Sequence, residues 1–301
     1  MFNYQMKLKV NILRNMENNL NNFAVFILTH GRPNNVITLK TLKKCGYTGK
    51  LFFIVDNEDK TANQYIKNFG KENVKIFDKK YMADNIDEGN NFDERRTITH
   101  ARNACFDIAK EIGVKYFIQL DDDYDNFRWR YINKYITKGY VQNLNNIFKS
   151  LLNFYKSINV KSIAMAQGGD FIGGESCGLL SNYKYNSRKC MNSFICSVDR
   201  PFKFVGAMNE DVNTYTSLAS RGVLFLTLPY IGLEQKQTQS QDGGITEMYL
   251  RFGTYCKAFT TVMMMPSSVV VSMMGFTQKR LHHRINWKHT TPMIIKEKYK
   301  N

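Results

Sequence analysis

The chain has 301 residues, of which 43% are hydrophobic and 13% aromatic, and this composition excludes a wholly disordered protein. Its 42 Lys and Arg outnumber 26 Asp and Glu, and the net charge of +16 favours an anionic partner such as nucleic acid, a nucleotide or a membrane surface. A Lys- and Asn-rich proteome would give the same excess, so charge alone leaves the partner open.

Three features favour a cytoplasmic protein without a membrane span. The six cysteines form no CxxC pair, which is typical of reduced thiols. The first ten residues hold no continuous apolar run, so we expect no secretory signal. The most apolar stretch, 259–276, is interrupted by Pro266 and by several hydroxyl residues, and we predict core strands around a turn there rather than a spanning helix.

After an Asn-rich arm at 1–22, short apolar runs alternate with amphipathic stretches. The elements predicted in the first half are a strand at 23–28, a helix at 33–46 with Pro33 in its first turn, a strand at 51–56, a helix at 60–70, a strand at 74–77, a loop at 78–96, a helix at 99–112 and a strand at 116–120. Strands that alternate with helices in this way predict an α/β fold, whose mostly parallel central sheet carries helices on both faces.

The second half is less regular. Its predicted elements are a helix at 142–158, a strand at 162–167, a helix at 210–221 and a strand at 223–229. Because the sequence shows no repeat and no clear linker, we predict one domain at 23–250. We expect 23–125 to form its nucleotide-binding half and 126–250 its acceptor half, with the basic segment 251–301 packed on the same domain.

Three consecutive carboxylates, Asp121–Asp123, end the predicted strand "YFIQL". Ligands of parallel sheets bind beyond the carboxyl ends of the strands, so this position favours a binding site. Side chains alternate along a strand, which places Asp121 and Asp123 on one side and Asp122 on the other. Two carboxylates on one side suit Mg²⁺ or Mn²⁺ shared with phosphate oxygens, and such an ion would offset their repulsion. The alternative is a solvated acidic turn.

This arrangement resembles the GT-A (Rossmann-like) glycosyltransferase fold, in which an Asp-x-Asp motif binds a metal ion and the diphosphate of a nucleotide-sugar. "ILTHGRP" resembles the first nucleotide-binding loop of that fold, "VDNED" its base- and ribose-reading carboxylate, and "RRTITHARNACFDIA" the helix before the motif. The resemblance implies that Asp121 and Asp123 hold Mn²⁺ or Mg²⁺ on a UDP-sugar. The donor-binding residues that it implies are Thr29, Arg32, Asp56, Arg96, Arg102, Asn103 and Asp122. For Arg102, an exposed helix cation is the alternative.

A second acidic motif lies in "FKFVGAMNEDVNTY". It resembles the motif that opens the acceptor-side helix of these enzymes and supplies the catalytic base, which implies Asp211 as the base and Glu210 as the second candidate. Helix capping would also explain these residues, because Asn209 is a good N-cap and acids near a helix start stabilise it by about 0.3–1 kcal/mol each.

Together with "QTQSQDGG", these motifs most resemble the TET/JBP-associated glycosyltransferases of phages and eukaryotes, over residues 23–250. That family acts on hydroxymethylpyrimidines in DNA. The resemblance implies transfer of a sugar, such as glucose from UDP-glucose, to 5-hydroxymethylpyrimidine in DNA, in the host cytoplasm if the protein is phage-encoded. Two alternatives stay open: a GT-A enzyme acting on a cell-surface polysaccharide or protein, and a DNA-binding module with an inactive donor site.

Basic residues interleaved with aromatic ones flank the acidic motifs, a mixture that suits a phosphate backbone with stackable bases. The residues expected to contact nucleic acid are Arg128, Arg130, Lys279, Arg280, Arg284 and Lys288. The alternative is a solvated basic face. In "LHHR", the GT-A resemblance makes His283, or its neighbour His282, a candidate third metal ligand, against an ordinary surface histidine pair.

Overall fold

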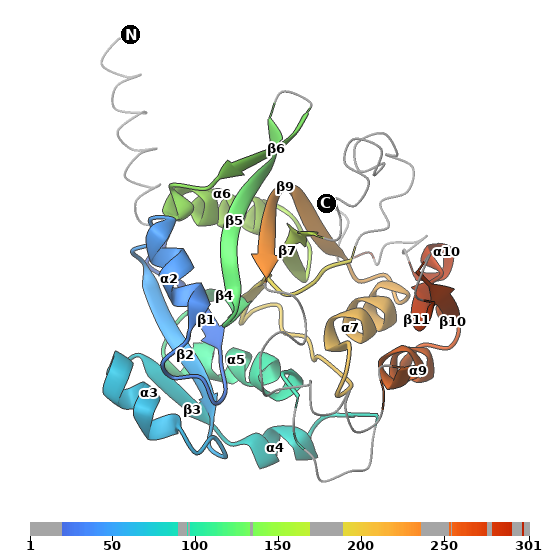
Figure 1. Cartoon of the computed structure of the whole chain (residues 1–301), viewed down its shortest axis with the longest axis horizontal. Helices are drawn as coiled ribbons and strands as arrows, with labels where there is room; N and C mark the ends of the chain where they lie inside the picture. Colours follow the sequence, from blue (N-terminus) through green and yellow to red (C-terminus); the bar gives the residue numbers. More distant parts are fainter. Residues whose placement is uncertain are drawn as a thin grey trace.

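A computed structural model of the chain describes residues 20–89, 95, 97–132, 135–168, 189–235, 253, 255–275, 279–290 and 297. Within them, a nine-stranded sheet lies between two layers of helices, and a separate two-stranded sheet lies near the C-terminal end (Figure 1). The predicted arm falls, for residues 1–19, outside the described residues. None of the helices in the described ranges is both long enough and apolar enough to cross a membrane.

The first half of the chain builds the parallel part of the sheet. Its strands are β1 (Phe23–Leu28), β2 (Lys50–Asp56), β3 (Val74–Phe77) and β4 (Tyr116–Asp121), in the order β3-β2-β1-β4. They pair in parallel, and Leu28 at the end of β1 lies opposite Asp121 at the end of β4. Every residue of β1 is buried, because helices cover both faces.

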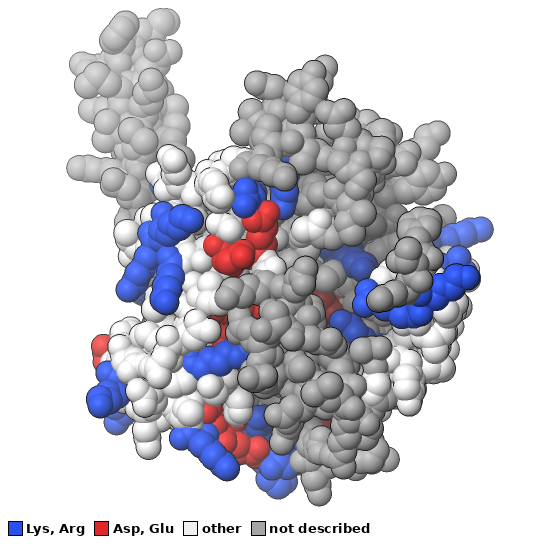
Figure 2. Space-filling model, in the orientation of Figure 1, with Lys and Arg blue, Asp and Glu red and all other residues white. Residues whose placement is uncertain are grey.

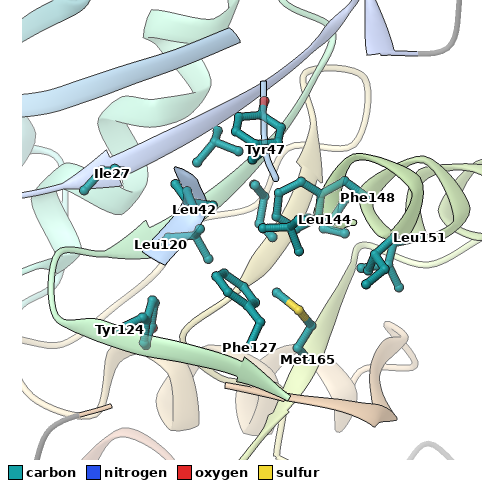
Figure 3. Packing of buried hydrophobic residues seen from close by; sticks show 14 of the residues in the cluster. Ile27, Leu42, Tyr47, Leu120, Tyr124, Phe127, Leu144, Phe148, Leu151 and Met165 are labelled. Carbon is teal, nitrogen blue, oxygen red and sulfur yellow. The ribbon is translucent and has the colours of Figure 1, made fainter. Parts of the chain in front are cut away.

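The helices of this half are α2 (Ile37–Lys44), α3 (Ala62–Phe69), α4 (Lys79–Asp84) and α5 (Thr99–Glu111). Alternate residues of β1 enter two cores. Ile27 packs in a core with Leu42 of α2 and Phe148 of α6 (Leu144–Ser157), which Figure 3 shows. Phe26 enters the opposite core with Cys105 of α5. The α/β fold with helices on both faces is confirmed.

The second half extends the same sheet. Its strands are β5 (Tyr124–Ile132), β6 (Tyr135–Tyr140), β7 (Ser162–Gln167), β8 (Phe194–Ser197) and β9 (Phe225–Gln235), in the order β4-β8-β7-β9-β5-β6. β5 and β8 run against the other strands, so the sheet is mostly but not wholly parallel. Both halves of the chain therefore share one sheet, and its division into donor and acceptor halves stays a prediction.

The described part of the C-terminal segment packs against α7 (Glu210–Ala219). It contains α9 (Tyr255–Met264), the antiparallel strands β10 (Val269–Met274) and β11 (Arg280–Ile285), and α10 (Trp287–Thr290). Tyr215 of α7 stacks on Trp287, with ring centroids 5.9 Å apart. This contact brings the segment next to the helix that carries the second acidic motif (Figure 1).

Two predicted elements are wrong in detail before β4. The helix expected at 33–46 begins only at Ile37, and Pro33 lies in the preceding loop, where its carbonyl accepts a hydrogen bond from Asn68. The loop expected at 78–96 contains α4. That short helix begins because the side chain of Asp78 accepts a hydrogen bond from the backbone N–H of Tyr81.

The prediction of two strands around a turn at 259–276 is also wrong, because the first of them is helical. α9 ends at Met264, and only β10 follows as a strand. Ala258 and Thr261, three residues apart, are the buried positions of α9 and mark its inner face. The run of Thr, Val and Met is therefore helical, and α9 packs against β10, β11 and α7.

Candidate active site

The acid triplet, Asp121–Asp123, lies at the carboxyl end of β4 beside the end of β1. The first turn of α2 fixes its backbone. Thr38 donates from its N–H to the carbonyl of Asp122 (3.0 Å) and from Oγ1 to the carbonyl of Asp121 (2.5 Å). The N–H of Tyr124 donates to Thr38 Oγ1 (2.9 Å). The acidic side chains are thus held on a defined turn, with partners that come from different parts of the fold.

Arg102, in α5, connects the acid triplet to the start of α7. Its Nε donates to Glu210 Oε1 (2.8 Å), and its Nη2 donates to Asp121 Oδ1 (3.0 Å). The residue is only 1% exposed, and its guanidinium lies over the rings of Phe194 and Phe204. Its Nη1 is buried without a hydrogen-bond partner among the described residues. The alternative of an exposed helix cation is excluded.

The charges of the acid triplet are only partly compensated. Burial, opposed by the charge of Arg102 and assisted by that of Asp123, raises the pKa of Asp121 to about 7. Burial also raises the pKa of Asp122, against the lowering effect of Arg32, and it raises the pKa of Asp123. Ionised carboxylates that are desolvated in this way would be stabilised by a cation.

Asp122 turns toward the loop after β1. Its Oδ2 accepts from Thr29 Oγ1 (2.7 Å), and its Oδ1 accepts from Arg32 Nη1 (3.0 Å). The hydroxyl of Tyr65, in α3, contacts Thr29 Oγ1 (2.8 Å) and accepts from the N–H of Arg32 (2.8 Å). The structure thus brings three of the predicted donor-binding residues together. Sequence reasoning missed Tyr65, whose periodic position indicates only a core residue.

Asp121 and Asp123 fit a divalent ion that is shared with phosphate. Both oxygens of Asp123 accept from Nε2 of Gln235 (2.9 and 3.0 Å), a neutral partner that leaves its charge in place. In the part of the chain that the structure describes, no three metal-ligating side chains converge, so His283 does not join these two carboxylates in such a group. Mg²⁺ is commonly held by one or two carboxylates together with phosphates and water.

Asp56, at the end of β2, is buried in a charged cluster. Its Oδ2 lies 2.6 Å from His30 Nδ1, and its Oδ1 accepts from Lys79 Nζ (3.3 Å). Burial raises the pKa of Asp56, but the hydrogen bond from His30 and the charge of Lys79 outweigh it, so the pKa lies below its usual value. The sequence carried no signal for Lys79, because α4 and β2 meet only in the folded chain.

Asn103 makes two hydrogen bonds to the loop that precedes α7. Its Nδ2 donates to the carbonyl of Phe204 and its Oδ1 accepts from the N–H of Phe204, both at 2.9 Å. This pairing occupies both ends of the amide, and the donor-binding role of Asn103 stays a prediction. Arg96 lies outside the described residues.

Glu210 and Asp211 begin α7, and both are buried. Glu210 is bonded to Arg102, whereas Oδ1 of Asp211 accepts from the N–H of Val212 (2.7 Å). We find no described hydrogen bond to Oδ2 of Asp211. Burial and the neighbouring Glu210 raise the pKa of Asp211 to about 6. Of the two acids, Asp211 therefore has the properties of a proton acceptor that works near neutral pH.

Asn209 is the N-cap residue of α7, as the capping alternative expected, but its side chain makes no capping hydrogen bond. Its backbone is left-handed (φ 53°), a conformation that Asn adopts more readily than most other non-glycine residues. Its Nδ2 donates instead to the carbonyl of Lys257 (2.8 Å) and to Thr261 Oγ1 (2.7 Å). The same amide lies 3.4 Å from Nδ1 of His283. The C-terminal segment therefore holds the residue just before the two acids.

The predicted nucleic-acid contacts fall into two groups. Arg128 and Arg130 both pair with Glu234, and Arg130 is buried, so the geometry does not favour Arg130 for that role. The other group is exposed on and next to β11 and α10 and comprises Lys279, Arg280, Arg284 and Lys288. Figure 2 shows Lys and Arg side chains gathered over this region, at the right of the view.

Several solved structures are similar to the chain at low identity. Glucosyl-3-phosphoglycerate synthase from Mycobacterium tuberculosis, in complex with Mg²⁺ and uridine diphosphate, is 8% identical with a TM-score of 0.45, and 87% of each chain is covered. Mannosyltransferase PcManGT from Pyrobaculum calidifontis, in complex with GDP-Man and Mn²⁺, is 11% identical with a TM-score of 0.45, covering 82% of this chain and 74% of that chain. Likeness at this level carries no inference about the chemistry of this chain.

Among curated proteins, none matches the chain. The family model described as TET-Associated Glycosyltransferase matches residues 23–244. The match takes in the whole nine-stranded sheet, the acid triplet, Arg102 and the start of α7. The sheet, with an Asp-x-Asp motif at the end of β4, has the GT-A arrangement expected from the sequence. Because the match spans most of the chain, this protein belongs to the TET-associated glycosyltransferase family.

Proposed function

We propose that this glycosyltransferase is metal-dependent and moves a sugar from a nucleotide-sugar, UDP-glucose or a relative, to the hydroxyl of 5-hydroxymethylpyrimidine in DNA. The observation that carries the proposal is the double contact of Arg102. One buried guanidinium holds a carboxylate of the acid triplet and a carboxylate at the start of α7. The groups suited to the donor and the groups suited to proton removal therefore share one site.

On the donor side, Asp121 and Asp123 would hold Mg²⁺ or Mn²⁺. When bound, the ion would stabilise the leaving diphosphate as a Lewis acid. Nη1 of Arg102 has a proton to donate and no described partner, and a phosphate oxygen of the donor would satisfy it. Asp56 and the loop from Thr29 to Arg32 would hold the nucleoside, as in the GT-A resemblance.

On the acceptor side, Asp211 would take the proton from the hydroxymethyl group. As that oxygen attacks the anomeric carbon, the bond from this carbon to the diphosphate breaks, and the proton passes to Oδ2 of Asp211. Glu210 is less suited because its Oε1 already accepts from Arg102. In duplex DNA, flipping the modified base would bring its hydroxyl to the donor at a cost of a few kcal/mol, roughly.

A DNA acceptor is supported by charge. The net charge of the chain is +16, and exposed Lys279, Arg280, Arg284 and Lys288 lie on the segment that packs against α7. The start of α7 carries Asp211. A polyanion that neutralised these cations would thus pass near the proposed base.

The proposal is tested with the purified chain, Mn²⁺ and a panel of radiolabelled nucleotide-sugars. We expect label to enter duplex DNA that contains 5-hydroxymethylpyrimidine and not the unmodified duplex. Transfer should stop with a chelator and in Asp121→Asn, because the ion then loses a ligand. Label that enters only a polysaccharide or protein would refute the DNA acceptor, and DNA binding without any donor turnover would refute the enzyme.

The rate of transfer should depend on pH through Asp211. Its pKa of about 6 means that the base is protonated below that pH, so kcat should fall as pH drops from about 8 to about 5. Asp211→Asn should lower kcat by roughly 10²–10⁴ and remove this step. If Glu210→Gln removed it instead, Glu210 would be the base.

The raised pKa of Asp211 also determines how the free energy of unfolding changes with pH. Asp211 binds its proton more tightly in the folded chain than in the unfolded one. Its contribution to the free energy of unfolding therefore falls as pH rises from about 4 to about 6.

A further inference from the structure

An open hollow with a cavity volume of about 490 Å³ lies between α6 and the sheet, and the acid triplet is not part of its lining. Its floor is apolar and contains Ile147, Leu151 and Ile231. Two aromatic residues, Trp129 of β5 and Tyr140 of β6, line it beside this floor. Nothing in the proposed reaction uses this hollow.

Side-chain amides of α6 and of the residues before it line the hollow as well. Gln142 and Asn146 are exposed, and their amides make no hydrogen bond to any described residue. Each amide has a hydrogen-bond donor and a hydrogen-bond acceptor, and this combination can pair with the edge of a planar heterocycle. The neighbouring Asn143 is not available in the same way, because its Oδ1 accepts from the N–H of Asn146.

Cations lie at the aromatic side of the hollow. Arg128 and Lys44 lie 4.4 Å and 5.2 Å from the ring centroid of Tyr140. Arg128 is also paired with Glu234, whereas Lys44 has no described ion pair. Lys44 belongs to α2, which carries further exposed lysines at 40 and 43 and no acid. Figure 2 shows Lys and Arg side chains over this helix, at the upper left.

We propose that the hollow holds one nucleotide of the DNA strand whose modified base enters the active site. The base stacks on Trp129, its edge meets the amides of Gln142 and Asn146, and its phosphate lies at Lys44. This assignment rests on the proposed DNA acceptor. A neutral sugar would also suit the aromatic ring and the amides, but it would leave the lysines of α2 without a partner. An anionic strand with stackable bases would contact the aromatic ring and the amides through its bases, and the lysines of α2 through its phosphates.

The path from the hollow to the acid triplet follows β5. Tyr124, next to the triplet, pairs with Gln235 of β9, and Trp129 pairs with Ile231 farther along the same two strands. Trp129 lies five positions after Tyr124 in β5, which is about 17 Å along an extended strand. That distance equals about five base steps of a duplex. One bound DNA segment can therefore reach both places.

The test measures DNA affinity of the full chain by fluorescence anisotropy, with a labelled duplex that contains the modified base. We expect Trp129→Ala and Tyr140→Ala to weaken binding, the former by roughly tenfold because a stacking partner is lost. Asn146→Ala should also weaken binding. Lys44→Glu should weaken it at low salt and little at high salt. The matched control is Lys67→Glu, because Lys67 is an exposed lysine in the last turn of α3. This variant should bind DNA with the affinity of the wild-type chain.

A second measurement separates this proposal from the proposed function. Transfer to a free 5-hydroxymethyl nucleoside needs only the active site, so it should be unchanged in Tyr140→Ala and Asn146→Ala while transfer to DNA falls. If the nucleoside and DNA both accept no sugar, the proposed function fails, and the anisotropy result still decides the hollow. The proposed nucleotide site is refuted if Lys44→Glu and Lys67→Glu change DNA affinity by the same amount. It is also refuted if a neutral glucan binds in the hollow while DNA affinity is unchanged in the hollow variants.

Discussion

Replacing Arg102 by alanine should abolish glycosyl transfer and lower the free energy of unfolding by about 3–5 kcal/mol. The guanidinium is buried and holds Asp121 and Glu210 at hydrogen-bond distance. Without it, the buried carboxylate of Glu210 and the partly buried carboxylate of Asp121 would lose the cation that lies between them. The measurements are a thermal unfolding curve and a transfer assay with Mn²⁺.

Arg102→Lys separates charge from geometry. Lysine keeps the positive charge but cannot bond two carboxylates through a planar fork. We expect a smaller loss of stability than with alanine and still a loss in kcat of roughly a hundredfold, the size that one misplaced electrostatic contact produces. The matched control is Arg200→Lys, because Arg200 donates to the carbonyls of Tyr155, Ile158 and Val160 rather than to the acids. That variant should lose stability and keep kcat. An Arg102→Lys enzyme with normal kcat would contradict the bridging role.

Asn209→Gly should lower kcat by roughly ten- to a hundredfold, the range expected when a catalytic group is displaced by about an ångström. Glycine tolerates the left-handed backbone, so this change removes the contacts of the amide with Lys257, Thr261 and His283 without adding backbone strain. Asn209→Ala adds backbone strain of about 1–2 kcal/mol. Because the acid triplet and Asp56 are untouched, KM for the donor should change little in either variant.

The control is Asn192→Gly, since Asn192 is the other described non-glycine residue with a positive φ. Its described contact uses its backbone carbonyl, which accepts from the hydroxyl of Tyr124 (2.8 Å) and which glycine retains. We expect this variant to keep kcat. Equal losses in Asn192→Gly and Asn209→Gly would show that backbone freedom, and not the anchoring of the acids, sets the rate. Normal kcat in Asn209→Gly would remove the positioning role altogether.

The sequence predicted the helices and strands whose local residue pattern indicates their secondary structure. β1 is a continuous apolar run because both of its faces are buried, β2 to β4 are mainly apolar, and α5 shows one apolar face in its spacing. The position of Asp121–Asp123 at a strand end also followed from the chain order. The family expected from the motifs is confirmed over residues 23–244.

The rest depended on contacts between segments far apart in sequence. Arg102 meets Glu210 across 108 positions, and Asn209 meets Thr261 across 52, so no local pattern reveals either pair. The same limit explains α9, whose β-branched residues favour a strand locally, whereas in the folded chain it packs as a helix against β10, β11 and α7. The left-handed backbone of Asn209 likewise follows from its distant partners rather than from its place before an acidic pair.

The guanidinium of Arg102 contacts one acid of the triplet and one acid at the start of α7. Under the proposed function, these contacts would couple the donor site to the acceptor site. Asp121 and Asp123 would hold the divalent ion, and Arg102, which contacts Asp121 and Glu210, would then link ion binding to the start of α7. Linkage requires that any effect of the ion on acceptor affinity equal the effect of the acceptor on ion affinity. Under the proposed function, the affinities for donor and for DNA would therefore depend on each other through the side chain of Arg102.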